Sequence, residues 1–192
     1  MPTVYDLKPR FQAALRPLVR RLAAAGVTAN QVTVAAGAAS AMLGAALAIE
    51  HRGWILLPVF LFVRMALNAM DGMLAREHGQ ASKMGAVLNE VMDLISDAAL
   101  TLPFATLPGW NSWLVAGAMV FAALTEIAGM AGPARRYDGP FGKSDRALAL
   151  GVMGLWLALG WPVSPMVRQM APPVWIVLCC ATIYQRIRRA FV

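Results

Sequence analysis

Apolar residues fill long stretches of the chain, and polar residues gather in the short breaks between them. Each apolar stretch is close to the roughly 20 residues that an α-helix needs to cross a bilayer. The pattern therefore predicts an all-α membrane protein with six transmembrane helices. We place them at residues 31–50, 54–74, 85–107, 112–132, 146–162 and 172–188.

The breaks between these segments consist of charged residues, glycine and proline. They are His51-Arg52-Gly53, Arg76 to Lys83, Pro108-Gly109, Pro133 to Lys143, and Pro162 to Pro173. Glycine and proline interrupt regular helices, and charges flank membrane spans rather than filling them. We therefore expect each break to be a loop.

The N-terminal stretch has a different pattern, because basic residues are interleaved with apolar ones at helical spacing. These residues are Leu15, Arg16, Leu18, Val19, Arg20, Arg21 and Leu22. A basic amphipathic helix of this kind is suited to an anionic membrane surface. Gly26 breaks the pattern, and Thr28 opens a helix-start signal. We expect one domain over residues 1–192, with an amphipathic interfacial helix at 1–28 and a six-helix bundle at 30–188.

Composition agrees with a membrane protein. Of the 192 residues, 59% are hydrophobic and 14% are charged, whereas a soluble domain is nearer half apolar and a quarter charged. The net charge of +7 does not indicate nucleic acid, because the cations cluster at the ends of apolar runs rather than along a stripe with aromatics. The two cysteines, Cys179 and Cys180, are neighbours within an apolar run, and we interpret them as packing residues.

The distribution of Lys and Arg predicts the orientation. Fourteen of the 17 lie before the first segment, after the second, after the fourth or at the end of the sixth, which all fall on one side of a six-span protein. Arg52 and Arg168 lie on the other side, and Arg64 lies within the second segment. Since cytoplasmic loops are enriched in cations, both termini are predicted to be cytoplasmic.

Ionisable residues inside the segments mark a candidate site, since charges at membrane depth are costly. Asn68 and Asp71 share a face of the second segment. Successive helix residues are about 100° apart, so one face of the third segment carries Asn89, Glu90, Asp93 and Asp97. Crowded oxygen ligands favour a hard divalent cation. Two other interpretations remain: hydrogen bonding between helices, and an ion or proton pathway.

The same residues form a motif. The run Asn68-Ala-Met-Asp71-Gly72-Met-Leu-Ala75-Arg76 is followed by eight residues and then by Gly85-Ala-Val-Leu-Asn89-Glu-Val-Met-Asp93. Every spacing resembles the CDP-alcohol phosphotransferase signature, D-x2-D-G-x2-A-R-x8-G-x3-D-x3-D. The first and third aspartates are Asn68 and Asn89 here, which is similar to a bacterial branch of that family.

The resemblance implies an activity and a cellular location. Family members transfer a substituted phosphate from a CDP-linked alcohol, commonly the lipid CDP-diacylglycerol, to an acceptor hydroxyl and release CMP. It also implies a multi-pass protein of the bacterial cytoplasmic (inner) membrane, a homodimer, a small alcohol as acceptor and no nucleic-acid partner. An alternative is a relative that binds lipid or nucleotide without turnover. A transporter built on the acids fits less well, because the acids gather near one leaflet.

The resemblance also assigns roles to residues. It implies a divalent cation, Mg²⁺ or Mn²⁺, on Asp71 and Asp93, with Asp93 also acting as the general base. The residues expected near the CDP group are Asn30, Thr33, Gly72, Ala75, Arg76 and Ser82. The loop before the fifth segment would help to form the acceptor pocket, through Lys143 and Arg146.

The two asparagines change the expected metal site. Asn68 and Asn89 offer only neutral carbonyl oxygens, so Asp71 and Asp93 supply two negative charges where the signature has four. Glu90 and Asp97 would restore the count. We therefore expect either that a second metal lies toward Glu90 and Asp97, or that the site keeps a single metal.

Overall fold

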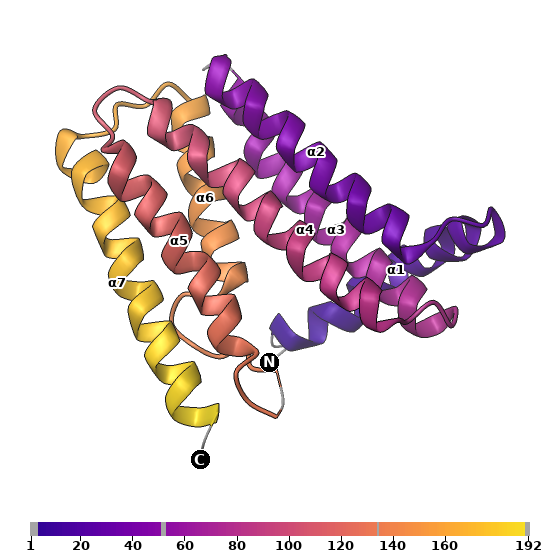
Figure 1. The fold of residues 1–192 in the computed structure, drawn as a ribbon. Coiled ribbons are helices and arrows are strands. Elements are labelled where there is room, and N and C mark those ends of the chain that lie inside the picture. Colours follow the sequence, from indigo (N-terminus) through magenta and orange to yellow (C-terminus); the bar gives the residue numbers. More distant parts are fainter. Residues whose placement is uncertain (1–3, 51–52, 134, 191–192) are drawn as a thin grey trace. The chain divides into compact units, whose positions relative to one another are not determined.

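The computed structural model describes residues 4–50, 53–133 and 135–190, and the regular elements of this part of the chain are helices (Figure 1). Arg52, one of the two cations expected on the far side of the membrane, lies outside the described residues. The helices are α1 (Val4–Ala24), α2 (Ala29–Ile49), η1 (Gly53–Ile55), α3 (Leu56–Glu77), α4 (Lys83–Thr101), η2 (Leu102–Thr106), α5 (Ser112–Gly129), α6 (Lys143–Ala158) and α7 (Pro165–Ala190).

Four stretches of the described chain are long and apolar enough to cross a membrane: Ala29–Ile49, Gly53–Glu77, Ser112–Gly129 and Pro165–Ala190. The prediction of an all-helical protein is confirmed. The other two expected spans correspond to α4 and α6. Helix α4 carries one lysine and three acids, and α6 has only 16 residues. Helix α4 is thus too charged, and α6 too short, to be counted as a span by length and composition, although both are regular helices.

The last helix begins earlier than the sequence predicts. The expected loop from Pro162 to Pro173 is wrong over most of its length, because α7 starts at Pro165 and includes Pro172 and Pro173. Ser164 precedes the helix and caps it, since its Oγ accepts a hydrogen bond from the Val167 N–H at 3.3 Å. Proline is well suited to the first turn of a helix, where its missing N–H has no partner to lose.

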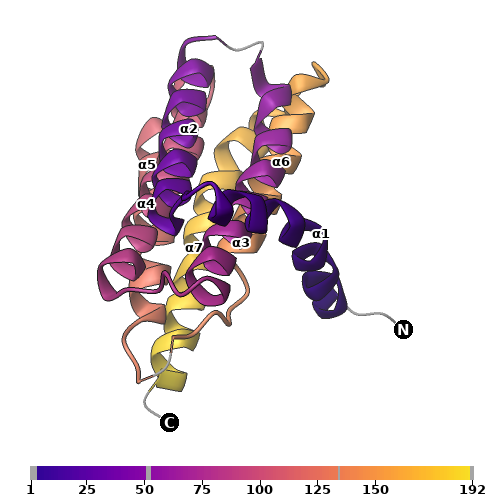
Figure 2. The same ribbon diagram turned by 90° about the vertical axis from the view of Figure 1, so that its right-hand side faces the viewer.

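The helices divide into two compact units, whose boundaries fall inside α2, α3 and α4. The first unit consists of Met1–Ala41 and Phe60–Ser96. Within it, α1 runs across the direction of α2 (Figure 2). Val19 of α1 is fully buried against a cluster that includes Val32 of α2 and Met73 of α3. This packing fixes the N-terminal helix to α2 and to α3, which carries the start of the motif.

The second unit consists of Met42–Val59 and Asp97–Val192. Helix α5 packs along α7, and α6 packs against η1. Rings of Trp54 and Phe104 lie 4.6 Å apart, and those of Phe104 and Trp110 lie 5.4 Å apart. Arg168 joins two loops of this unit, because it donates to Val163 O at 2.7 and 2.9 Å and to Pro108 O at 3.1 Å.

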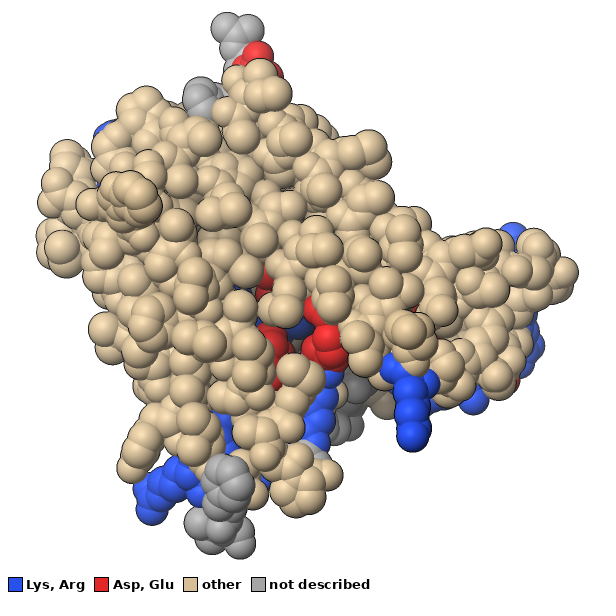
Figure 3. Space-filling model, viewed as in Figure 1, with Lys and Arg blue, Asp and Glu red and all other residues tan. Residues whose placement is uncertain are grey.

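The outer faces of the helices are largely uncharged. On the face drawn in Figure 3, uncharged residues cover most of the surface, and acidic side chains show only in small patches. Large apolar side chains are exposed, for example Phe62 at 61%, Trp113 at 87% and Val177 at 66%. Such surfaces suit a lipid environment, in which apolar groups point outward.

Candidate functional site

Asp71 is the most deeply buried acid of the motif. It lies on α3 and is 5% exposed. Its Oδ2 accepts hydrogen bonds from Thr33 Oγ1 of α2 at 2.9 Å and from Asn89 Nδ2 of α4 at 3.1 Å. One carboxylate oxygen thus joins three helices of the first unit, α2, α3 and α4.

Asp93 lies on the facing helix α4 and has a corresponding set of donors. Its Oδ1 accepts from Asn68 Nδ2 at 3.1 Å and from Arg64 Nη2 at 3.2 Å, both on α3. The same Arg64 nitrogen also lies 3.2 Å from the main-chain oxygen of Asp93.

The motif residues therefore pair crosswise between α3 and α4. Each aspartate accepts from the asparagine of the opposite helix: Asp71 from Asn89, and Asp93 from Asn68. Helical spacing explains this arrangement, because residues three or four apart share a face. The four positions that the motif singles out are thus brought together.

Residues expected near the nucleotide gather at the ends of these helices. A Cβ on Gly85 would lie 2.8 Å from Asn30 Oδ1 and 2.9 Å from Ser82 Oγ, so these three residues are close neighbours. A Cβ on Gly72 would lie 3.0 Å from the Arg76 guanidinium, which folds back over the glycine. Glycine at both positions leaves backbone open where another group approaches.

Ser82 also has a structural role. Its Oγ accepts a hydrogen bond from the Gly85 N–H at 2.9 Å, so it caps the first turn of α4. Serine is a preferred residue at this position. The cap holds the Ser82 hydroxyl close to Asn30.

Sequence reasoning missed Gln80, which connects the loop after α3 to the start of α2. Its Oε1 accepts from the Ala29 N–H at 2.6 Å, and its Nε2 donates to Val27 O at 3.4 Å. Thr28 and Gln31 form a reciprocal cap at the same helix start, at 2.9 and 3.2 Å. The cap has a sequence signal, Thr-x-x-Gln, whereas the Gln80 contact spans 51 residues and has none.

The oxygen donors of this cluster fit a hard divalent cation. Carboxylates of Asp71 and Asp93, and the amide oxygens of Asn68 and Asn89, are the ligand types that Mg²⁺ and Mn²⁺ prefer. Among the residues that the structure describes, no group of three or more His, Cys, Asp or Glu could by itself hold a metal ion. The donor set therefore depends on amide oxygens or on substrate oxygens to complete the coordination.

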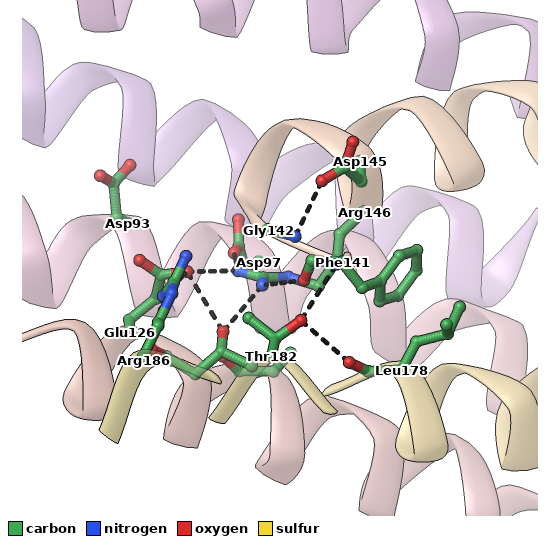
Figure 4. A network of polar contacts seen from close by, with 12 residues as sticks. Asp93, Asp97, Glu126, Phe141, Gly142, Asp145, Arg146, Leu178, Thr182 and Arg186 are labelled. Atoms are coloured by element: carbon green, nitrogen blue, oxygen red, sulfur yellow. Dashed lines mark hydrogen bonds and ion pairs between the residues drawn. The ribbon is translucent and has the colours of Figure 1, made fainter. Parts of the chain in front are cut away.

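A second polar cluster lies in the other unit and is centred on Arg146 of α6 (Figure 4). This arginine is 7% exposed. Its guanidinium donates to Glu126 Oε1 at 2.9 Å, to Thr125 Oγ1 at 2.9 Å and to Asp97 Oδ2 at 3.3 Å. It also donates to Phe141 O at 3.3 Å. Arg146 thus joins the end of α4 to α5, α6 and the loop before α6.

Arg186 of α7 is the second buried arginine of this cluster. It is 1% exposed, and its Nη1 lies 3.6 Å from Glu126 Oε1. Its Nε donates to Asp138 O at 2.9 Å. Thr182, one turn earlier, accepts from the Phe141 N–H at 3.0 Å. These contacts hold the loop before α6 against α7.

Asp138 adds a more exposed ionic contact to the same loop. Its carboxylate accepts from Arg136 and Arg189, each at 2.9 Å. Burial raises the pKa of Asp138, but these hydrogen bonds outweigh burial and hold the pKa below its ordinary value.

The expected site residues are thus divided between the units. Glu90 is half-buried on α4, one residue after Asn89, in the first unit. Asp97 is ion-paired with Arg146 in the second unit, where Lys143 is half-buried at the first position of α6. Glu126 was assigned no role from the sequence. An acid inside an apolar segment is costly without a cation partner, so the position of Glu126 in the sequence indicated that it has such a partner.

Comparison with known proteins gives a family match and several relatives. The family model described as CDP-alcohol phosphatidyltransferase matches residues 26–183. Inner membrane protein YnbA of Escherichia coli is 48% identical over 163 residues, which cover 82% of this chain and 81% of that protein. Archaetidylinositol phosphate synthase of Pyrococcus horikoshii is 31% identical over 107 residues, 56% of this chain and 55% of that protein.

A solved structure has the same fold. The crystal structure of Mycobacterium tuberculosis phosphatidylinositol phosphate synthase, in complex with manganese and citrate, superposes with a TM-score of 0.75 at 19% identity. The match covers 92% of this chain and 88% of that one.

Proposed function

The chain belongs to the CDP-alcohol phosphatidyltransferase family, and from this premise we propose that it transfers a phosphatidyl group from CDP-diacylglycerol to the hydroxyl of a small alcohol. CMP is the second product. The reaction belongs to phospholipid synthesis and takes place at the cytoplasmic face of a bacterial inner membrane.

The observation that carries the proposal is the crosswise pairing of Asp71 with Asn89 and of Asp93 with Asn68. These four residues stand at the four aspartate positions of the signature. Their convergence supports a reaction centre at this point between α3 and α4. A chance match of spacing would not require the side chains to meet.

Asp93 is the general base in this proposal. Its carboxylate takes the proton of the acceptor hydroxyl, whose oxygen forms a bond to the lipid-bearing phosphorus as the bond from that phosphorus to CMP breaks. Arg64 and Asn68 both donate to Oδ1 of Asp93. These donors fix the orientation of the carboxylate relative to α3.

Asp71 and Asp93 would hold the divalent cation, with amide oxygens of Asn68 and Asn89 as neutral ligands. A bound cation supplies charge stabilisation to the pyrophosphate as the leaving group forms. Gly72, Ala75, Arg76, Ser82, Asn30 and Thr33 would form the CDP pocket. In this pocket Arg76 would donate charge-assisted hydrogen bonds to phosphate oxygens, and the glycine beneath it would allow the nucleotide to approach the backbone.

Lys143 and Arg146 would contribute to acceptor binding. Lys143 stands at the first position of α6, directly after the loop that precedes this helix. Arg146 would act mainly by fixing the loop that precedes α6, because its guanidinium already contacts Phe141 O and three side chains.

The proposal includes a membrane arrangement: six spans, α1 lying on the cytoplasmic leaflet, both termini in the cytoplasm, and a homodimer. The count of 14 cations against two supports this orientation. Reporter fusions at each end of the chain test it, and we expect cytoplasmic reporters to be active at both. A periplasmic signal at either end would contradict it.

The central experiment is an assay of CMP release. Purified protein in lipid nanodiscs is mixed with CDP-diacylglycerol, Mn²⁺ or Mg²⁺, and a panel of small alcohols. We expect CMP and a new phospholipid to form in equal amounts, only with metal and with one class of acceptor. Absence of CMP with every acceptor and both metals would sink the proposal.

A second candidate function is binding of a CDP-linked lipid without turnover. One observation favours it: the two aspartates accept hydrogen bonds from amides at positions where the signature has acids. CDP binding measured by calorimetry, alongside the CMP assay, separates the two. Binding with no CMP release would favour this candidate.

A further inference from the structure

Arg64 is a cation in the middle of the apolar helix α3. The whole residue is 5% exposed and its side chain is 6% exposed. The guanidinium forms an ion pair with Asp93. A buried charge at membrane depth is costly unless it is compensated. Arg64 precedes the first motif position by four residues, so the motif itself does not account for it.

The contacts of Arg64 place its charge on one of the two motif acids. Its Nη2 lies 3.2 Å from Oδ1 of Asp93 and 3.2 Å from the main-chain oxygen of the same residue. Asn68, one turn along α3, donates to that same Oδ1 at 3.1 Å. Asp93 is therefore flanked on its α3 side by a guanidinium and an amide.

Arg64 brings a positive charge to a place where a second metal ion would need a negative one. Of the four signature positions, only Asp71 and Asp93 are acids, and Asn68 and Asn89 are neutral. The guanidinium of Arg64 already shares Oδ1 of Asp93 with the Asn68 amide, so it repels a divalent cation that approaches the same oxygen. Asp97 is paired with Arg146 in the other unit.

We propose that this site holds one divalent cation and that the Arg64 guanidinium occupies the place of a second, beside Asp93 and position 68. Arg64 is then a positioning residue, since it fixes Asp93 while it limits the site to one metal. This inference rests on the proposed function, because it concerns the metal that the phosphatidyl transfer uses.

Counting bound Mn²⁺ tests the proposal without reference to activity. The full chain in nanodiscs is titrated with Mn²⁺, and the free ion is measured by its paramagnetic resonance signal. Three variants accompany the wild type: Asn68→Asp, Arg64→Gln with Asn68→Asp, and a matched control, Arg16→Gln with Asn68→Asp. Arg16 is an exposed arginine that pairs with Glu77 at 2.9 Å, so its loss leaves the motif untouched.

We expect one Mn²⁺ per chain in the wild type, in Asn68→Asp and in the control. The variant that lacks Arg64 and carries Asp at position 68 gains one acid and loses the guanidinium beside Asp93, and it should bind two Mn²⁺ with a spin-coupled signal. Two Mn²⁺ in the wild type or in Asn68→Asp, or one in the variant without Arg64, would overturn the inference. The wild-type count decides by itself if that variant does not fold.

The outcomes also separate this inference from the proposed function. Two Mn²⁺ in a wild type that releases CMP would reject the role of Arg64 and leave the transferase intact. No Mn²⁺ in the wild type would reject both. One Mn²⁺ in a wild type that releases no CMP would support the metal count and reject turnover.

Discussion

The two polar clusters of this protein use similar residues in different proportions. Around Asp71 and Asp93, the amides of Asn89 and Asn68 donate to the carboxylates, and Arg64 adds a contact to Asp93. Around Arg146 and Arg186, the acids Glu126 and Asp97 are held in ion pairs. We call this second group, with two arginines and two acids, the balanced cluster. An arginine neutralises the acid that it holds, whereas a neutral amide orients a carboxylate and leaves its charge in place.

The largest effect is expected for Asp93→Asn. The amide keeps the shape of the carboxylate but does not accept a proton at neutral pH, so CMP release should fall about 1,000-fold, equivalent to about 4 kcal/mol. Binding of CDP should be affected much less. Steady-state kinetics and calorimetry measure the two effects.

The control for Asp93→Asn is Glu77→Gln, an acid-to-amide change at an ion pair with the exposed Arg16. This variant should keep near wild-type CMP release. A variant at Asp93 with wild-type turnover under saturating substrate would show that the base is another group.

The next effect concerns the balanced cluster. Glu126→Gln removes the acid that faces both buried arginines, at 2.9 and 3.6 Å. A broken buried ion pair leaves a charge without compensation, so the free energy of unfolding should fall by about 3 kcal/mol. Thermal unfolding in detergent measures the change.

Arg135→Gln provides the comparison for Glu126→Gln, because Arg135 contacts the same carboxylate from a more exposed position at 3.6 Å. It should cost less than about 1 kcal/mol. Equal losses for the two variants would mean that burial does not set the strength of this cluster.

A smaller effect is expected for Arg76→Gln. Arg76 lies over Gly72, and loss of its charge should weaken CDP binding about tenfold, equivalent to about 1.4 kcal/mol. The melting temperature without ligand should stay near the wild-type value. Unchanged CDP affinity in calorimetry would remove Arg76 from the nucleotide pocket.

The smallest effect is expected for Asp138→Asn, in the loop before α6. Arg136 and Arg189 hold the pKa of Asp138 below its ordinary value. The carboxylate therefore stabilises the folded state fully at pH values above the ordinary pKa of Asp, which is about 4. The stabilisation is lost as the pH falls through the lowered pKa. At pH 7 the free energy of unfolding of the variant should therefore be lower than that of the wild type, by less than about 1 kcal/mol. This gap between the two proteins should close at lower pH. A gap that does not shrink as the pH falls, down to the lowest pH at which both proteins remain folded, would contradict the assignment.

The helices and the shared faces of the motif residues could be predicted from the sequence, because both depend on local spacing. Residues three or four apart share a helix face, so Asn68 with Asp71, and Asn89 with Asp93, were expected on facing surfaces. The start of α7 was predicted wrongly, because Pro172 and Pro173 were interpreted as the end of a loop between helices. Prolines remove local hydrogen bonds but do not end a helix that packing elsewhere stabilises.

The partners of the buried arginines could not be predicted in the same way. Arg146 meets Asp97 across 49 positions and Arg186 meets Thr125 across 61. No local pattern encodes such distances. The sequence shows only that Arg64 and Glu126 are charged residues inside apolar segments and therefore need partners. The fold determines which partners they contact.

The long reach of Arg186 has a consequence for the order of biosynthesis. The motif residues and their partner Thr33 lie between positions 33 and 93, so all of them exist before α5 is made. Glu126, by contrast, leaves the ribosome before Arg146 and well before Arg186. During synthesis α5 therefore carries an acid whose two buried arginine partners have not yet been translated, and these ion pairs form only after α6 and α7 have been made. The motif residues can come together early, while the balanced cluster closes only when α7 has been made.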